Sequence, residues 1–252
     1  MMRMLLEAPV FTIEAAIKAA EFGVDRIELC ADFGEGGTTP SIGTLIYLKK
    51  KISIPIFVMI RPRGGDFVYS DEELEIMKID LQMLKTLGAD GFVFGVLKAD
   101  GKVNIGACED LIQLTDGLPC TFHRAIDATP SLEKSLEAII ECGFRRVLTS
   151  GGSNTVEAGK EMVKKLMVRA ADRIVILPGG GTSPEHVPYF ESTGYLKELH
   201  ASCKMFRPSK NRFYPKDLKL STDPNSYKQI LTIDPDKVAA FRAVMDQKNE
   251  RI

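Results

Sequence analysis

The sequence predicts one α/β domain folded as a (β/α)8 barrel of the TIM type. Short apolar segments alternate with helix-like stretches along the chain, and eight of these segments are strand candidates. The length of 252 residues is typical of such a barrel. No linker divides the chain near its midpoint, so residues 1–252 are assigned to a single domain.

The predicted strands are short and largely apolar, which is typical of parallel strands that are buried on both faces. The clearest is Ile56–Ile60, which is bracketed by Pro55 and Pro62. In chain order the eight candidates are Met4–Glu7, Arg26–Cys30, Ile56–Ile60, Gly91–Gly95, Cys120–His123, Arg146–Thr149, Ile174–Leu177 and Leu199–Ala201.

The predicted helices begin at recognisable capping residues. Thr12 precedes an amphipathic stretch that ends at Gly23. Ser70 and Glu73 have the spacing of a capping box and open a helix that ends at Gly88. Pairs of a capping residue and a first-turn proline predict further helix starts at Thr129-Pro130, Ser183-Pro184 and Asp234-Pro235.

The turn that joins a helix to the next strand has the same pattern three times. A helix ends on glycine, one apolar residue follows, and a polar residue opens the strand, at Gly23–Ile27, Gly88–Phe92 and Gly143–Val147. Repeated use of one turn indicates units stacked in one direction, as in a barrel. An open doubly wound sheet is the alternative; we rank it second because no strand is followed by a GxGxxG pattern.

The segment Lys204–Ile233 has no clear period and contains Pro208, Pro215 and Pro224. It follows the eighth strand, so it starts on the functional face of the predicted barrel. We predict a long irregular loop here, either a lid or a mobile insertion.

Composition excludes several classes of protein. The net charge of −1 and a pI of about 6.4 argue against a general nucleic-acid or membrane surface. The start, MMRMLLEAP, does not resemble a secretory signal, and no apolar run reaches the length of a membrane span. The five cysteines form no CxxC pair, so we expect reduced thiols in a cytoplasmic protein.

Polar residues at the carboxyl ends of barrel strands form the active sites of such folds. The candidate acid, base and catalytic residues are Glu7, Glu28, His123, Arg124, Asp127 and His200. Two of the three histidines fall at strand ends, where pKa values are often tuned, whereas His186 is expected on a helix surface. A structural ion pair with an arginine remains the alternative for Glu7 and Glu28.

A second group of residues predicts an anion site. Arginine side chains offer fixed donors and glycines expose backbone amides, so we expect a small anionic ligand, including a phosphorylated one. The residues are Arg61, Arg63, Asp66, Ser150, Gly151, Gly179, Gly180 and Ser202. The alternative is that these glycines only form turns. No lysine lies at a predicted strand end, which disfavours a Schiff-base aldolase, and no HExxH, Walker or GxSxG pattern is present.

Several long motifs resemble the signature blocks of one family, the CutC proteins, which are named for copper homeostasis. The motifs are ELC at Glu28–Cys30, EGGTTPS at Glu35–Ser41, RPRGGDF-x-YSDEE at Arg61–Glu73, TFHRAID at Thr121–Asp127, RVLTSGG at Arg146–Gly152 and PGGG at Pro178–Gly181. They run from the first predicted strand toward the eighth and so cover most of the chain.

The resemblance implies a cytoplasmic TIM barrel that self-associates and binds copper(I). The family's proposed copper site uses two cysteines near the ends of the first two strands. Cys30 matches the second cysteine, but Pro9 stands where the first is expected. Because proline offers no ligand, we expect copper(I) to bind weakly here or through other ligands. The polar residues at the strand ends favour the alternative, an enzyme of unknown reaction.

Overall fold

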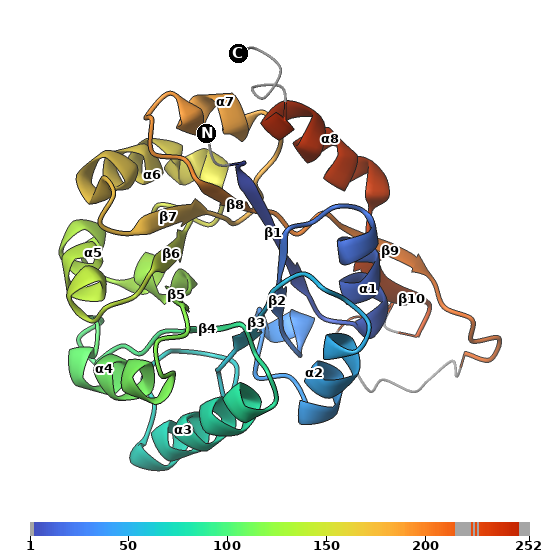
Figure 1. Cartoon of the computed structure of the whole chain (residues 1–252), viewed down its shortest axis with the longest axis horizontal. Helices are drawn as coiled ribbons and strands as arrows, with labels where there is room; N and C mark the ends of the chain where they lie inside the picture. Colours follow the sequence, from blue (N-terminus) through green and yellow to red (C-terminus); the bar gives the residue numbers. More distant parts are fainter. Residues whose placement is uncertain (1–2, 215–222, 224, 226, 247–252) are drawn as a thin grey trace.

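Eight parallel strands form the wall of a barrel, and helices surround it (Figure 1). The computed structural model describes residues 3–214, 223, 225 and 227–246. The strand order is β7-β6-β5-β4-β3-β2-β1-β8, and β7 lies beside β8, so the sheet curves into a nearly closed barrel. The predicted (β/α)8 fold is therefore confirmed.

The strands lie close to their predicted positions. They are β1 (Leu5–Val10), β2 (Arg26–Leu29), β3 (Ile56–Met59), β4 (Gly91–Phe94), β5 (Cys120–Phe122), β6 (Arg146–Thr149), β7 (Val175–Pro178) and β8 (Glu198–His200). The largest difference is in β1, which continues three residues past the predicted end at Glu7. Glu7 therefore lies inside the barrel, below the mouth, instead of at the carboxyl end of its strand.

Eight helices follow the strands in turn. They are α1 (Ile13–Glu21), α2 (Ile42–Lys49), α3 (Asp71–Thr86), α4 (Ile105–Leu114), α5 (Leu132–Glu141), α6 (Val156–Ala170), α7 (His186–Glu191) and α8 (Pro235–Asp246). Two short 3-10 helices, η1 (Phe33–Glu35) and η2 (Arg124–Ala128), lie in the loops after β2 and β5. No helix in the described ranges combines the length and the apolarity of a membrane span.

Most predicted helix caps are confirmed. The Thr12 hydroxyl accepts a hydrogen bond from the Ala15 amide, Ser70 and Glu73 form both bonds of the capping box, and α8 begins at Pro235. Two helices, α5 and α7, begin later in the chain than predicted. Helix α5 is capped by Ser131, while the Thr129 hydroxyl instead donates to the Ile126 carbonyl.

Helix α7 also starts later than Ser183-Pro184 predicted. It begins at His186, which is 7% exposed and not on the surface as expected. Its ring contacts the Ser183 hydroxyl and the Glu157 carboxylate, at 2.8 and 2.9 Å. The contact between α6 and α7 therefore buries a histidine that was predicted to be exposed.

The segment expected to be an irregular loop contains a β-hairpin. Strands β9 (Lys204–Pro208) and β10 (Gln229–Ile233) pair antiparallel beside α1. The hairpin is tied to α1, because the Arg207 guanidinium binds the Glu14 carboxylate and the Thr12 hydroxyl donates to the Leu231 carbonyl. The prediction of an irregular loop was therefore wrong at both ends of the segment, where the chain forms strands. Residues 215–222, 224 and 226 of the segment lie outside the described residues.

A chain of buried ion pairs crosses the barrel interior. The Glu7 carboxylate accepts a hydrogen bond from Arg26 at 2.6 Å, and Arg26 also binds Glu198. Arg146 donates to the same Glu198 carboxylate at 2.7 Å. The Phe57 ring contacts both guanidinium groups, 4.6 Å from Arg26 and 5.1 Å from Arg146. These contacts join β1, β2, β3, β6 and β8 beneath the mouth.

We expect Glu7→Gln to destabilise the fold by about 3–5 kcal/mol, because it removes the charge that compensates the buried Arg26. Urea denaturation would measure the change. The matched control is Glu137→Gln, whose partly exposed carboxylate pairs with Arg169 and Arg173 and should cost less than about 1 kcal/mol. Equal costs for the two substitutions would contradict a structural role for the interior ion pairs.

The Phe57 ring fits the interior only because β4 begins with a glycine. A Cβ atom on Gly91 would lie 2.6 Å from the Phe57 ring and 2.7 Å from the Pro119 carbonyl oxygen. We therefore expect Gly91→Ala to lower stability by about 1–3 kcal/mol. In contrast, Gly106→Ala in α4 meets no atom within 4 Å. It should leave stability unchanged or raise it by up to about 1 kcal/mol. Thermal or urea denaturation distinguishes the two results.

Candidate functional site

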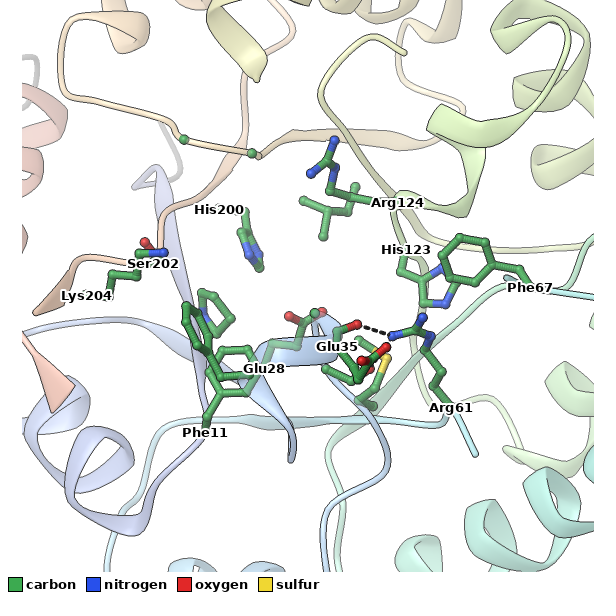
Figure 2. A pocket seen from close by; sticks show the side chains of 18 residues that line it. Phe11, Glu28, Glu35, Arg61, Phe67, His123, Arg124, His200, Ser202 and Lys204 are labelled. Carbon is green, nitrogen blue, oxygen red and sulfur yellow. Dashed lines mark hydrogen bonds between the residues drawn. The ribbon is translucent and has the colours of Figure 1, made fainter. Parts of the chain in front are cut away.

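A cavity of about 380 Å³ opens at the carboxyl ends of the strands (Figure 2). It is lined by Pro9, Phe11, Glu28, Phe33, Glu35, Gly36, Gly37, Met59, Arg61, Phe67, His123, Arg124, Leu148, Gly180, Gly181, His200, Ser202 and Lys204. Acidic, basic and aromatic side chains thus share one site at the end of the barrel where such enzymes bind their substrates.

Seven of the fifteen residues that the sequence proposed for the site line this cavity. They are Glu28, Arg61, His123, Arg124, Gly180, His200 and Ser202. The other candidates, Glu7, Asp127, Ser150, Gly151, Gly179, Arg63, Asp66 and Cys30, are not part of the lining. The chemical roles expected of all these residues stay predictions.

Glu28 combines burial with an unused acceptor. The side chain comes from β2, is 4% exposed, and its Oε1 atom has no hydrogen-bond partner in the described residues. Burial raises the pKa of this carboxyl from 4.5 to about 7; the Glu7 charge raises it too, while His200 opposes both. Glu28 can therefore gain or lose a proton near neutral pH.

His123 is held in the neutral form. Burial and the nearby Arg61 charge lower the pKa of the imidazole from 6.5 to about 3. Nδ1 accepts a hydrogen bond from the Ala125 amide at 3.3 Å, which places the ring proton on Nε2. Nε2 is buried and has no partner among the described residues. It is thus a neutral donor for a ligand or an ordered water.

His200, the last residue of β8, is oriented by Glu7 from below. Its Nδ1 atom lies 2.8 Å from the Glu7 carboxylate, which leaves Nε2 for a ligand in the cavity. Burial lowers the pKa of His200, but the Glu7 hydrogen bond and the Glu28 and Glu7 charges outweigh it, so the pKa is raised. For Glu7, burial is likewise outweighed by Arg26 and His200, and its pKa falls to about 2.

Arg61 lines the cavity, but its guanidinium group mainly holds two loops together. It donates hydrogen bonds to the carbonyl oxygens of Glu35, Gly37 and Gly65, at 2.6, 3.0 and 2.8 Å. The sequence predicted that this side chain holds an anion. Its donors are instead largely used by the backbone, while its charge still acts on His123.

The loop after β6 is filled by a carboxylate of the protein itself. Asp127 accepts hydrogen bonds from the amides of Ser150 and Gly152 and from the Thr149 and Ser150 hydroxyls. It also pairs with Arg124 at 2.9 Å. The amides that the sequence offered to an anion are therefore occupied, and Asp127 is an anchor of this loop instead of a free acid or base.

Two further predicted amides are also bonded within the protein. The Gly151 amide donates to the Thr149 hydroxyl at 2.9 Å, and the Gly179 amide donates to the Thr149 carbonyl at 3.0 Å. Gly180 and Gly181 differ, because both line the cavity and their amides donate to no group in the described part of the chain. Of the glycine amides that we considered for an anion site, those of Gly180 and Gly181 therefore remain available to a ligand.

One cationic side chain, Arg124, lies beside these amides. Arg124 lines the cavity here, and a Cβ atom on Gly180 would come within 3.4 Å of the Arg124 Nη1 atom. Ser202 and Lys204 line the wall after β8. Lys204 opens β9, so a lysine does reach the mouth, although none was expected at a strand end. Arg124 and the two amides can together bind an anionic group, and Lys204 adds positive charge at another part of the mouth.

An aromatic wall, which was not predicted from the sequence, lines part of the cavity. Phe11 and Phe33 form an edge-to-face pair with ring centroids 5.2 Å apart, and the Lys204 ammonium lies 4.7 Å from the Phe33 ring. On the other side, Phe67 packs on the His123 ring at 4.8 Å. Alternation along β1 was the available signal for Phe11, because Glu7, Pro9 and Phe11 point to the same side of an extended strand.

Arg63 and Asp66 lie outside the cavity. The Arg63 guanidinium pairs with Glu73 and with Asp66, and its side chain contacts the Tyr69 ring. These bonds join the loop after β3 to the first turn of α3. The two residues thus stabilise the start of α3. Arg61 belongs to the same RPRGGD motif, and nothing in the motif predicted that only Arg61 would line the cavity.

Cys30 lies under the cavity in a small cluster with Phe57, Met59 and Val93. Burial, with the Glu28 charge, raises the pKa of its thiol well above the usual value. Pro9 pairs in register with Glu28 on the neighbouring strand and supplies no sulfur. Within the described residues, no group of three or more histidine, cysteine or carboxylate side chains is arranged to hold a metal. The mouth therefore does not fit a two-thiolate copper(I) site.

Comparison with known proteins identifies the family. The CutC family model matches residues 4–205. The chain belongs to the CutC family. A human relative named copper homeostasis protein cutC homolog is 40% identical over 241 residues, which is 95% of this chain and 88% of the relative. A CutC family protein of Xylella fastidiosa is 42% identical over 199 residues, or 79% and 74% of the two chains.

The fold agrees with that membership. A crystal structure of CutC from Streptococcus agalactiae superposes with a TM-score of 0.73 at 35% identity. The match covers 79% of this chain and 98% of the other. The resemblance noted in the sequence motifs is therefore confirmed, and so is its implication of a TIM barrel.

The raised pKa of Glu28 predicts that part of the free energy of unfolding depends on pH. The folded state holds this proton more tightly than the unfolded chain, whose value is near 4.5. The contribution is therefore fully present below about pH 4.5 and is lost as the pH rises through about 7. Its size is on the order of 3 kcal/mol.

Glu28→Gln, which stays neutral, lacks this term. The stability of the variant minus that of the wild type should therefore rise between pH 5 and pH 8, as followed by urea denaturation. A difference that does not change with pH would show that the Glu28 pKa is ordinary.

Proposed function

We propose that this protein is an enzyme that binds a small anionic ligand at the barrel mouth and transfers a proton through Glu28. The observation that carries the proposal is the Glu28 carboxyl, which is buried, has an unpartnered oxygen and has a pKa of about 7. Such a group is suited to general acid–base catalysis at neutral pH.

The neighbouring residues support definite roles. Neutral His123 offers an N–H donor that can polarise a carbonyl or stabilise a developing negative charge without giving up its proton. His200, paired with Glu7, provides a second ring nitrogen at the opposite side of the cavity. Arg124 and the amides of Gly180 and Gly181 would hold a carboxylate or phosphate group of the ligand, and Lys204 would add positive charge at the mouth.

Proton transfer can be tested before the natural reaction is known. Small carboxylates, keto acids and phosphate esters would first be screened for thermal stabilisation of the wild type. Compounds that bind would then be incubated in D₂O, and exchange of their carbon-bound hydrogens would be followed by NMR. Glu28→Gln should slow exchange by about 10²–10⁴-fold while retaining binding.

Different substitutions should affect ligand binding and hydrogen exchange in this experiment. Arg124→Gln should weaken binding of the same compounds, and Arg173→Gln, at the amino-terminal end of β7, should change neither property. The proposal fails if no anion binds, or if exchange catalysed by the wild type is unaffected in Glu28→Gln.

A role in copper homeostasis is the second candidate function. The names of the human and other relatives support it, and Cys30 with Met59 provides two sulfur atoms beneath the cavity. We expect copper(I) binding at this place to be weak, because the thiol is protonated and Pro9 offers no second thiolate. Cytoplasmic location and self-association belong to this candidate and stay predictions.

A copper(I) competition titration with a chromogenic chelator tests the expectation for the mouth. Cys30→Ser should retain the copper(I) stoichiometry of the wild type. Tight binding of one equivalent that disappears in Cys30→Ser would instead establish the mouth as a copper site.

A further inference from the structure

The aromatic wall of the cavity, formed by Phe11 and Phe33, is partly open at the mouth. Phe33 is 39% exposed, and Phe206 on β9 continues the wall beyond the cavity lining with an exposed fraction of 41%. The ring centroids of Phe33 and Phe206 are 6.3 Å apart, again edge to face. Exposed aromatic residues that gather beside a cavity are typical of a binding surface, because their contact with water is unfavourable until a ligand covers them.

The loop that carries Phe33 is fixed in place by hydrogen bonds. At its base, Ala31 and Thr38 exchange two backbone hydrogen bonds of 2.9 and 3.0 Å. Within the loop, the buried Arg61 guanidinium donates to the Glu35 carbonyl at 2.6 Å. The Phe33 ring therefore occupies its position at the mouth before a ligand arrives, which lowers the entropy cost of binding.

The wall lies across the cavity from the groups that suit an anion. Figure 2 shows Phe11 and Arg124 on opposite sides of the opening, and the free amide of Gly180 is on the Arg124 side. A ligand held at both sides would span the cavity that Glu28 lines. With a volume of about 380 Å³, the cavity is at the small end of ligand sites, so it has room for an anionic group and one ring.

We propose that the ligand of the mouth is a small anion that also carries a planar unsaturated ring, and that Phe33 and Phe11 select it by contact with that ring. The inference rests on the proposed function, because it takes the anionic group to bind beside Arg124. Aromatic rings prefer edge-to-face or offset contacts with other rings, so a planar ring gains more from this wall than a saturated ring of similar size. The Lys204 ammonium, 4.7 Å from the Phe33 ring, adds a cation that favours the electron-rich face of such a ligand.

The test is calorimetric binding of pyruvate, cyclohexylpyruvate and phenylpyruvate to the full-length protein, with methyl, cyclohexyl and phenyl phosphate as a parallel series. In at least one series the wild type should bind the phenyl compound about threefold or more tighter than the cyclohexyl compound. Phe33→Leu keeps an apolar side chain but removes the ring. It should weaken binding of the phenyl compound by about 3–10-fold and leave that of pyruvate or methyl phosphate unchanged. The matched control is Phe213→Leu, which removes a ring that is 75% exposed and outside the cavity lining, and it should change no affinity.

The possible outcomes separate this inference from the proposed function. Equal affinities of the phenyl and cyclohexyl compounds for the wild type, or phenyl binding that Phe33→Leu leaves unchanged, would overturn ring selection alone. Anion binding beside Arg124 and Glu28-dependent hydrogen exchange would still stand in that case. Ring selection with exchange that is unaffected in Glu28→Gln would overturn the proton transfer alone. Absence of binding by every compound of both series would overturn both proposals.

Discussion

The ion pair between Glu7 and Arg26 is the interaction on which both the barrel and its site depend. It is buried between β1 and β2, and its partners extend through Glu198 to Arg146 on β6. Charges in this position are tolerated because each one is paired and hydrogen-bonded. The same Glu7 carboxylate orients His200, and its negative charge contributes to the raised pKa of Glu28. The layer that holds the strands together therefore also sets the protonation of the mouth.

The polar residues at the mouth differ mainly in whether their hydrogen bonds are already made. Asp127 is charged and lies near the cavity, yet its carboxylate is occupied by the amides of a neighbouring loop. Arg61 donates both terminal nitrogens to loop carbonyls and keeps only its Nε atom without a partner in the described residues. Glu28 and His123 keep buried atoms without partners. Because an unsatisfied buried polar atom costs free energy, such atoms are retained mainly where a ligand or water completes them. Of the residues that line the cavity, Glu28, Arg61 and His123 keep such atoms, and the pKa values of Glu28 and His123 are strongly shifted.

The family name and the geometry of the mouth concern different kinds of chemistry. Copper(I) favours soft thiolate and thioether ligands, whereas the cavity offers mostly carboxyl, imidazole and guanidinium groups, with Met59 as the sulfur-containing residue of its lining. The one thiol near it, on Cys30, is buried and protonated, and the proline on the neighbouring strand cannot assist it. The mouth thus fits proton transfer better than it fits copper(I) binding.

The sequence by itself determined the barrel, because eight buried strands, helix caps such as Ser70 with Glu73, and a repeated αβ turn are local patterns. It also placed Glu28, His123 and His200 at the mouth, since strand ends converge in this fold. Only the tertiary structure decided which side chains stay available. Asp127 fills the β6 loop, Arg63 turns to Glu73, and Phe33 reaches the cavity through contacts with residues distant in sequence. Those pairings depend on distances between loops, which no local pattern of residues encodes.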